Sequence, residues 1–253
     1  MEHLDRHAPG AAAAYVAVAG ARVAPSYDVA APAVVAFAEQ FAVDVSVIDD
    51  AQRAAFLAAT GASAFAAVQR VYVGDVWPRV RAVVDAVLGP AGWPEPPAVE
   101  VADLWPLLDA FMREVARLDA LDPVTTELVR LRGARQHDCR VCRSRRSVAA
   151  LDAGASEATF DAVDRWPDSD LPADAKAALA LTDATIWTPY AVPADVVAAA
   201  RAHLSDAQVV EVVLDVARNA ANKIAVALRA DAAEVTDGVQ LFTTDAEGNL
   251  TTV

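Results

Sequence analysis

The sequence predicts an all-α protein. Hydrophobic residues make up 55% of the 253 residues, aromatic residues only 6%, and alanine dominates the apolar share. Alanine is the best helix former, and small side chains allow helices to pack closely. Alternating runs of β-branched residues, which mark strands, are almost absent before residue 235. A chain of this length can bury a full core in one large domain or two small ones.

The first half, residues 1–88, is divided by prolines and glycines into helical segments. Glycine and proline punctuate helices because they supply unusual backbone angles or remove a donor. Pro78 lies inside the longest segment and is expected to kink it. We expect helices at residues 11–23, 34–41, 49–60 and 63–88, the third ending at Gly61 and the last at Gly89.

Residues 89–103 are too rich in proline and glycine for a helix and are expected to form a linker between two halves. The second half, residues 104–253, carries clearer helix starts. Asp122, Asp138, Ser156 and Ser205 are typical N-cap residues. The helices expected here cover residues 104–120, 123–135, 139–154, 156–165, 172–187, 193–203 and 205–228, and a small hairpin turns at residues 247–249.

A weak internal repeat relates the two halves. Residues 34–84 align without a gap on residues 178–228, at an offset of 144. Similar side chains recur at this offset in the pairs Asp75/Asn219, Arg79/Lys223 and Val80/Ile224. The pattern indicates a degenerate duplication. Because the first half has no counterpart of the cysteine region described below, at most one half is expected to be catalytic.

The formal net charge of −14 argues against non-specific binding to nucleic acid or to an anionic membrane. The sequence contains no stretch of 18 or more uncharged apolar residues, so no transmembrane helix is predicted. Residues 11–21 resemble the apolar core of a signal peptide, but the residues before them lack its positive start. Two cysteines three positions apart suit a reducing compartment. We therefore expect a cytoplasmic protein.

Both cysteines lie in one C-x-x-C segment, Cys139 and Cys142, within an arginine-rich stretch. Seven arginines fall within residues 130–146 of an otherwise acidic chain. With Asp138 as the cap, Cys139 would occupy the first turn of a helix, where the backbone N–H groups and neighbouring arginines favour a thiolate. A second cysteine three positions on can close a disulfide. The spacing indicates a dithiol redox centre.

Other interpretations of these residues remain open. A zinc site would need two more ligands, and His3, His7, His137 and His203 are the histidines available. The two cysteines can instead be unreactive core residues, and the arginines solvated partners of the many acids. We expect His137 in a surface loop and Trp187 and Tyr190 in the core. Asp215 and Lys223 are expected to be solvated or paired charges.

The order of these motifs resembles the AhpD-like and carboxymuconolactone decarboxylase family. The resemblance rests on E-L-V-R-L-R at Glu127, on C-R-V-C, on S-V-A-A-L-D-A-G-A-S after it, and on S-D-A-Q-V-V-E-V-V-L-D-V-A-R-N-A-A-N-K-I-A. It covers about residues 104–230, with a weaker echo in 34–84. It implies a helical bundle, a homo-oligomer (dimer or trimer), no metal or organic cofactor, and a thioredoxin-like or lipoyl-bearing protein as reductant.

The family pattern places a histidine four residues after the second cysteine, where this chain has Arg146. In the peroxidase branch the acid and the histidine relay protons to the cysteine pair. By resemblance Glu127 handles the proton or orients the thiolate, Cys142 attacks a hydroperoxide and Cys139 closes the disulfide, although the two cysteines can exchange roles. Arginine does not accept a proton, but Arg146 can stabilise a thiolate and can pair with Glu127.

Three functions follow from these observations. The first is a thiol-dependent antioxidant oxidoreductase of the alkylhydroperoxidase or disulfide reductase type. The second is a decarboxylase-like lyase acting on a small carboxylate lactone, which the arginines would bind. The third is a helical protein without catalysis, in which the cysteines are structural.

Overall fold

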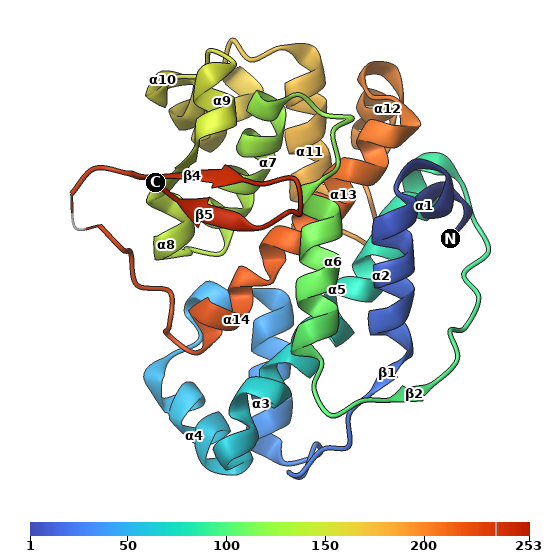
Figure 1. The fold of residues 1–253 in the computed structure, drawn as a ribbon, viewed down its shortest axis with the longest axis vertical. Helices are drawn as coiled ribbons and strands as arrows, with labels where there is room; N and C mark the ends of the chain where they lie inside the picture. Colours follow the sequence, from blue (N-terminus) through green and yellow to red (C-terminus); the bar gives the residue numbers. More distant parts are fainter. Residues whose placement is uncertain (236) are drawn as a thin grey trace.

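A computed structural model describes residues 1–235 and 237–253, and it confirms a mainly helical fold with small sheets. Helices from both halves pack around α13 (Asp206–Ala220), which contacts α5, α6, α7 and α11. In Figure 1 the first half lies in the lower and right part of the view, and a two-stranded hairpin crosses the front near α6.

The helices of the first half lie close to their predicted positions. They are α1 (Glu2–His7), α2 (Pro9–Gly20), α3 (Pro32–Val43), α4 (Asp50–Thr60) and α5 (Ala64–Leu88), with short 3-10 turns at Val45–Val47 and Gly61–Ser63. Helix α1 was not predicted. Gly61 ends α4 with a φ of 55°, a conformation that favours glycine. Helix α5 runs unbroken through Pro78.

The linker prediction for residues 89–103 is correct in lacking a helix, but the segment also packs against the first half. Its short strand β2 (Val99–Glu100) pairs in parallel with β1 (Ala21–Arg22). The Trp93 ring lies 6.0 Å from the Tyr15 ring, and its indole N–H donates to the carboxylate of Asp85. Arg81 lies over the same indole.

The second half contains α6 (Trp105–Ala116), α7 (Pro123–Gln136), α8 (Arg140–Arg143), α9 (Val148–Asp152), α10 (Glu157–Asp161), a 3-10 segment at Ala162–Asp168, α11 (Ala173–Trp187), α12 (Ala194–His203), α13 and α14 (Asn222–Ala227). The predicted caps at Asp122, Ser156 and Ser205 are confirmed, since each side chain accepts an N–H from the first turn of its helix.

One predicted helix is wrong. Residues 139–154 do not form a single helix but divide into α8, the strand β3 (Arg145–Ser147) and α9. The cause is a tertiary pairing, because β3 aligns in parallel with β4 (Gln240–Thr244), far along the chain. Strand β4 then pairs antiparallel with β5 (Leu250–Thr252), which confirms the predicted C-terminal hairpin. The closing helix is also divided, at Ala221, into α13 and α14.

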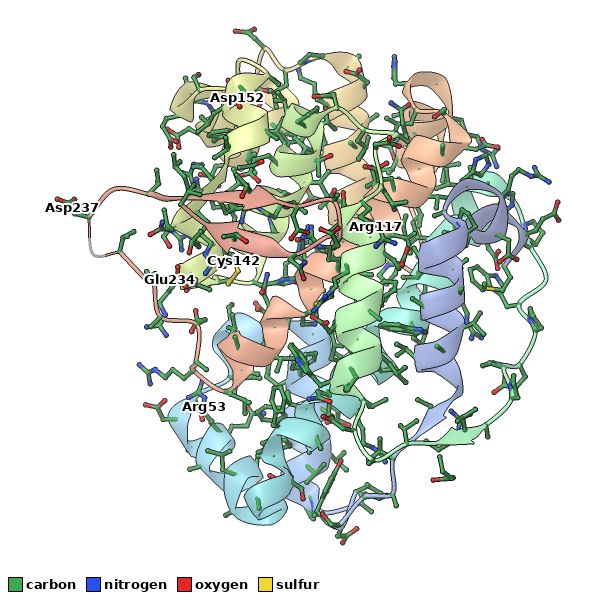
Figure 2. The ribbon with its side chains drawn as sticks, viewed as in Figure 1. Arg53, Arg117, Cys142, Asp152, Glu234 and Asp237 are labelled. Carbon is green, nitrogen blue, oxygen red and sulfur yellow. A yellow bond between two sulfur atoms is a disulfide. The ribbon has the colours of Figure 1, made fainter. Side chains whose placement is uncertain are left out.

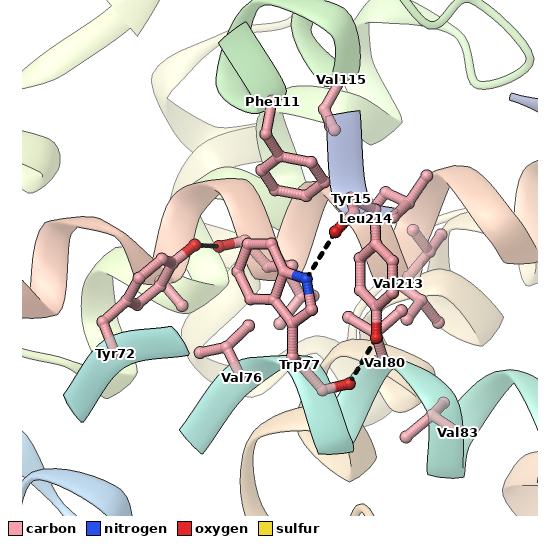
Figure 3. Close-up of a cluster of buried hydrophobic side chains, with 14 of the residues drawn as sticks. Tyr15, Tyr72, Val76, Trp77, Val80, Val83, Phe111, Val115, Val213 and Leu214 are labelled. Atoms are coloured by element: carbon pink, nitrogen blue, oxygen red, sulfur yellow. Dashed lines mark hydrogen bonds between the residues drawn. The ribbon is translucent and has the colours of Figure 1, made fainter. Parts of the chain in front are cut away.

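One large hydrophobic core extends across both halves of the chain, and a smaller cluster that includes Leu131, Phe160 and Leu179 lies within the second half. Figure 3 shows its centre, where the Tyr15 hydroxyl donates to the Trp77 carbonyl at 2.9 Å and the Trp77 indole donates to the Tyr15 carbonyl at 3.0 Å. Tyr72 on α5 donates to the carbonyl of Ala217 on α13 at 2.6 Å. These bonds satisfy buried polar groups, and the bond from Tyr72 to Ala217 also joins the two halves.

Helix positions agree with the proposed repeat. The 144-residue offset carries α3 onto 176–187, inside α11, and α4 onto 194–204, which is α12 with one further residue. Residues related by the offset also line one small buried cavity: Ala42/Ile186, Val43/Trp187, Val76/Ala220 and Arg79/Lys223. The Arg79 guanidinium donates to both Ala42 and Ile186 carbonyls, at 2.7 and 2.6 Å. The duplication is supported in this way but stays a prediction.

Among the described residues, one helical stretch, residues 50–88, is long and apolar enough to cross a membrane by length and composition alone. A core helix of a soluble protein passes the same test, so this is weak evidence. Helix α5 buries Tyr72, Trp77 and Val84 against the rest of the protein.

Candidate functional site

The two cysteines are joined in a disulfide, with their Cα atoms 5.3 Å apart. Cys139 is fully buried, and its sulfur accepts the backbone N–H of Cys142 at 3.3 Å. Cys139 is therefore the N-cap of α8, and the prediction that Asp138 caps this helix is wrong. Asp138 has a φ of 50° and its carboxylate pairs with Arg143. Cys142 is 5% exposed and lines a cavity.

Glu127 is buried in α7, one turn before Arg130, and the two form a bidentate ion pair with distances of 2.6 and 2.7 Å. The same guanidinium donates to the carbonyl of Cys142 and to that of Arg145, both at 2.8 Å. The predicted acid thus stands close to the cysteine segment, and Arg130 connects them. Sequence reasoning did not single out Arg130.

Arg146 occupies a different position from the one expected. Its guanidinium binds the carboxylate of Glu157 at 2.9 to 3.2 Å and lies over the ring of Phe160. It also donates to the carbonyls of Arg143 and Arg145. The expected pairing with Glu127 is wrong, because Glu127 pairs with Arg130. Arg146 holds β3 against α10, and it does not line the cavity next to Cys142.

Asp231, which follows α14, anchors the start of α8. Its carboxylate accepts the Arg140 backbone N–H at 2.9 Å and pairs with the Arg140 guanidinium at 2.6 Å. Its carbonyl accepts the N–H of Val141 at 3.0 Å. Burial is the largest single effect on the pKa of Asp231 and raises it, but the hydrogen bonds and the charge of Arg140 together outweigh burial and lower the pKa. The C-x-x-C turn is thus fixed from both α7 and the segment after α14.

The cavity beside Cys142 has a volume of about 330 Å³. Its polar wall consists of arginine and asparagine side chains: Arg113, Arg130, Arg145, Arg218, Asn219, Asn222 and Asn249. Its apolar wall includes Met112, Val141, Phe242 and Leu250. Phe242 and Leu250 belong to the β4–β5 hairpin, and Figure 2 shows Cys142 close to that hairpin. We call this cavity the cysteine lobe.

A second cavity of about 290 Å³ adjoins it, and its lining includes Asp119, Glu127 and Asp215. We call this second cavity the acidic lobe. The two lobes share Arg130, Arg218, Asn219 and Phe242 as lining residues. Asp215 lines only the acidic lobe. Arg218 therefore lies at the junction, with Cys142 on one side and Asp215 on the other.

Burial dominates the electrostatics of α13. It raises the pKa of Asp215 to about 8, against the attraction of Arg218, and one oxygen of this carboxyl has no hydrogen-bond partner. Burial also raises the pKa of Glu211 to about 7, although this carboxylate accepts the N–H groups of Ala120 and Leu121. Asp215 is thus largely protonated at pH 7.

The cavity residues of α13 and α14 were missed by sequence reasoning, which expected Asp215 to be a solvated or paired charge. The signal was nevertheless present. Polar residues recur at 211, 215, 218, 219 and 222, a spacing that puts them on one face of an otherwise apolar helix.

Three other expectations are wrong. His137 is buried at 7% exposure rather than in a surface loop, and burial lowers its pKa to about 3, helped by Lys223 and Arg79. Trp187 and Tyr190 are exposed at 43% and 70% rather than packed in the core. For Lys223, expected to be a solvated or paired charge, the second alternative is confirmed: it is buried and pairs with Asp75 at 2.8 Å.

A metal centre finds no support in the described part of the chain. Within residues 1–235 and 237–253, no three His, Cys, Asp or Glu side chains are grouped so that they could hold a metal ion.

Two relatives from Mycobacterium tuberculosis match most of the chain. They are uncharacterized protein MT2376 of strain CDC 1551 / Oshkosh and uncharacterized protein Rv2313c of strain ATCC 25618 / H37Rv. Each is 46% identical over 226 residues, which span 86% of this chain and 80% of the relative. The chain belongs to their family. No family model matches the chain, and no solved structure matches it. The names of these relatives state no activity.

Proposed function

We propose that the protein is a thiol-dependent oxidoreductase of the AhpD-like type, which cycles Cys139 and Cys142 between dithiol and disulfide. One observation carries the proposal. Cys142 lines an arginine-bearing cavity, while its disulfide partner Cys139 is fully buried behind it. An accessible attacking thiol with a protected resolving thiol is the arrangement that dithiol chemistry requires.

In the reduced protein the Cys142 thiolate attacks the terminal oxygen of a hydroperoxide. The O–O bond breaks, Cys142 becomes a sulfenic acid and the released alkoxide takes a proton to leave as an alcohol. The Cys139 thiolate then attacks the sulfenic sulfur, expelling hydroxide, which is protonated to water as the disulfide forms. A dithiol reductant, which we propose to be a thioredoxin-like or lipoyl-bearing protein, returns both cysteines to thiols.

The cavity arginines favour this chemistry. Arg130 and Arg218 line the same lobe as Cys142, and positive charge beside a thiol stabilises the thiolate. The bidentate pair with Glu127 holds the Arg130 guanidinium in place, so we propose that Glu127 is a positioning residue for Arg130 rather than a proton relay. Arg146 is proposed to position β3 through Glu157.

The resemblance extends the proposal to a cytoplasmic homo-oligomer, a dimer or trimer, that acts without a metal or an organic cofactor. These points rest on the family likeness and on the acidic composition, not on a particular contact.

The test is reduction of cumene hydroperoxide by dithiothreitol, with the wild type, Cys142→Ser, Cys139→Ser, the double cysteine variant and, as a control that lines neither cavity, Ser144→Ala. We expect the cysteine variants to lose activity and Ser144→Ala to keep it. Mass spectrometry should detect a sulfenic acid on Cys142 in the Cys139→Ser variant. Undiminished activity in the double cysteine variant would refute the proposal.

A lyase that acts on a small carboxylate lactone is the second candidate. The observation in its favour is the cation Arg218 in a cavity large enough for such a substrate. Full lyase activity of the double cysteine variant on a carboxylated lactone would favour it over the redox proposal.

A further inference from the structure

We propose that Arg218, Asn219 and Asn222 form an oxyanion subsite, so that the substrates attacked by Cys142 are organic molecules that carry a carboxylate. This inference rests on the proposed redox function and names its substrate class. It also stands on a binding property of the cavity that can be measured without any reaction.

Arg218 is the cavity arginine whose charge is left available. The other three arginines of the cysteine lobe already have carboxylate partners: Arg113 with Asp109 at 2.7 Å, Arg130 with Glu127 at 2.6 Å and Arg145 with Glu234 at 2.6 Å. Among residues 1–235 and 237–253, the guanidinium of Arg218 makes no hydrogen bond and no ion pair. Its donors therefore face the cavity without a protein acceptor.

The surroundings of Arg218 favour the binding of an anion. Burial lowers the pKa of its guanidinium, and Arg130 acts in the same direction, whereas Asp215 and Glu127 raise it. Asp215 lies one turn before it on α13 but is largely protonated at neutral pH. Arg218 is partly buried, and of its two carboxyl neighbours Glu127 is already paired with Arg130, so the guanidinium lacks a bonded counterion, which is costly. A bound carboxylate would remove that cost.

Neutral donors lie on the same helical face. The side-chain amides of Asn219 and Asn222 line the cysteine lobe and make no hydrogen bond within the described residues. The protonated carboxyl of Asp215 has an unpartnered oxygen in the adjoining lobe. A planar guanidinium with amide donors in the same cavity is suited to a carboxylate, which accepts two parallel bonds.

The remaining walls indicate an organic body for this ligand. Met112, Val141, Phe242 and Leu250 give the cysteine lobe an apolar side, and its volume of about 330 Å³ lies in the range of small-molecule sites. Because Cys142 lies in the same lobe, a ligand held by its carboxylate at Arg218 presents its other end to the sulfur.

Two disulfide reagents that differ in charge test the subsite. 5,5′-Dithiobis(2-nitrobenzoate) carries carboxylates, and 4,4′-dithiodipyridine is neutral. With either, the Cys142 thiolate attacks one sulfur and releases an aryl thiolate. Cys139 then displaces the second aryl thiolate and closes the protein disulfide. Two electrons pass to the reagent, and the two thiol protons go to solvent or to the released thiolates.

We expect Arg218→Ala to slow the carboxylated reagent about 10- to 100-fold, the usual size of a lost charged hydrogen bond, and to leave the neutral reagent within about 2-fold. Arg6→Ala, which removes an exposed, paired arginine that lines neither lobe, is the control and should change the rate of neither reagent. Asn222→Asp places a negative charge on the subsite and should slow only the carboxylated reagent. It keeps the test available if Arg218→Ala does not fold.

Benzoate titration into the oxidised protein separates this inference from the redox proposal. The wild type should bind benzoate, and Asn222→Asp and Arg218→Ala should not. Equal slowing of both reagents by the variants, or benzoate binding unchanged by them, would overturn the subsite. Failure of Cys142 to react with either reagent, with benzoate binding intact, would overturn the redox function and leave the subsite standing.

Discussion

Arg130→Met removes the counterion of a buried carboxylate and tests whether the Glu127–Arg130 pair holds the site together. The variant loses two bonds to Glu127, at 2.6 and 2.7 Å, and two to the carbonyls of Cys142 and Arg145, at 2.8 Å each. Glu127 is 2% exposed, and the N–H of Ser147, at 3.2 Å, would be its remaining hydrogen-bond partner, so its charge would be left without a counterion. Breaking a buried pair of this kind costs about 3–5 kcal/mol of unfolding free energy.

The double variant Glu127→Gln, Arg130→Met gives the sharper result. It removes both charges, so the penalty of an unpaired buried carboxylate disappears, and we expect it to recover about 2 kcal/mol of the loss. The control is Arg113→Met, whose pair with Asp109 is exposed at 46% and 38% and should cost less than about 1 kcal/mol.

The assay is reversible urea unfolding at pH 7, followed by far-ultraviolet circular dichroism with the disulfide intact. An Arg130→Met variant within about 1 kcal/mol of the wild type would refute the reasoning, since it would show that Glu127 does not depend on Arg130. A double variant less stable than Arg130→Met would refute it as well, by showing that the lost packing outweighs the charge.

Three further predictions concern stability. The pKa of Asp215 is raised from 3.8 to about 8 in the folded protein, so the stability that comes from its protonated form is complete below pH 3.8 and is lost as the pH rises towards 8. Relative to the wild type, the unfolding free energy of Asp215→Asn should be unchanged at pH 4 and higher by up to about 4 kcal/mol at pH 7. Equal differences at the two pH values in urea titrations would contradict this. Tyr15→Phe deletes a buried hydrogen bond and should cost about 1–2 kcal/mol, whereas Tyr190→Phe, 70% exposed, should change thermal stability by less than about 0.5 kcal/mol. Gly248→Ala should lower the melting temperature, because Gly248 has a φ of 82° and a Cβ there would clash with the backbone of Arg113; an unchanged melting curve would argue against this packing of the hairpin.

Local signals predicted the elements whose causes are local. Asp122 and Ser205 begin their helices because each side chain accepts an N–H three residues away or fewer, and Gly61 ends α4 because it adopts a positive φ. The residues 139–154 could not be predicted in this way. Their strand exists because Arg145–Ser147 pairs with residues 240–242, and no pattern near the cysteines indicates that partner.

In the candidate site, too, some residues were predictable from local sequence and others depend on the fold. The cysteine pair and Glu127 were found by spacing and resemblance, which are properties of the sequence. The partner of Glu127 depends on which arginine the fold turns towards it, and among seven candidates the choice of Arg130 over Arg146 was not readable. The polar face of α13 could have been read as a cavity wall, since its spacing is helical.

The polar residues of α13 differ in whether the fold uses them, as Glu211 and Arg218 show. Glu211 has a clear structural task, because its carboxylate accepts two N–H groups of the loop before α7. Arg218 makes no hydrogen bond or ion pair within the described residues, and its partial burial lowers the pKa of its guanidinium, so its nearby carboxyl groups compensate the charge only in part. Arg218→Leu should therefore raise the unfolding free energy by about 1 kcal/mol while it removes the preference of Cys142 for carboxylated disulfides. Urea unfolding and the paired reagents measure the two effects in one variant. A loss of stability greater than about 1 kcal/mol would show that Arg218 is kept for the fold and not for a ligand.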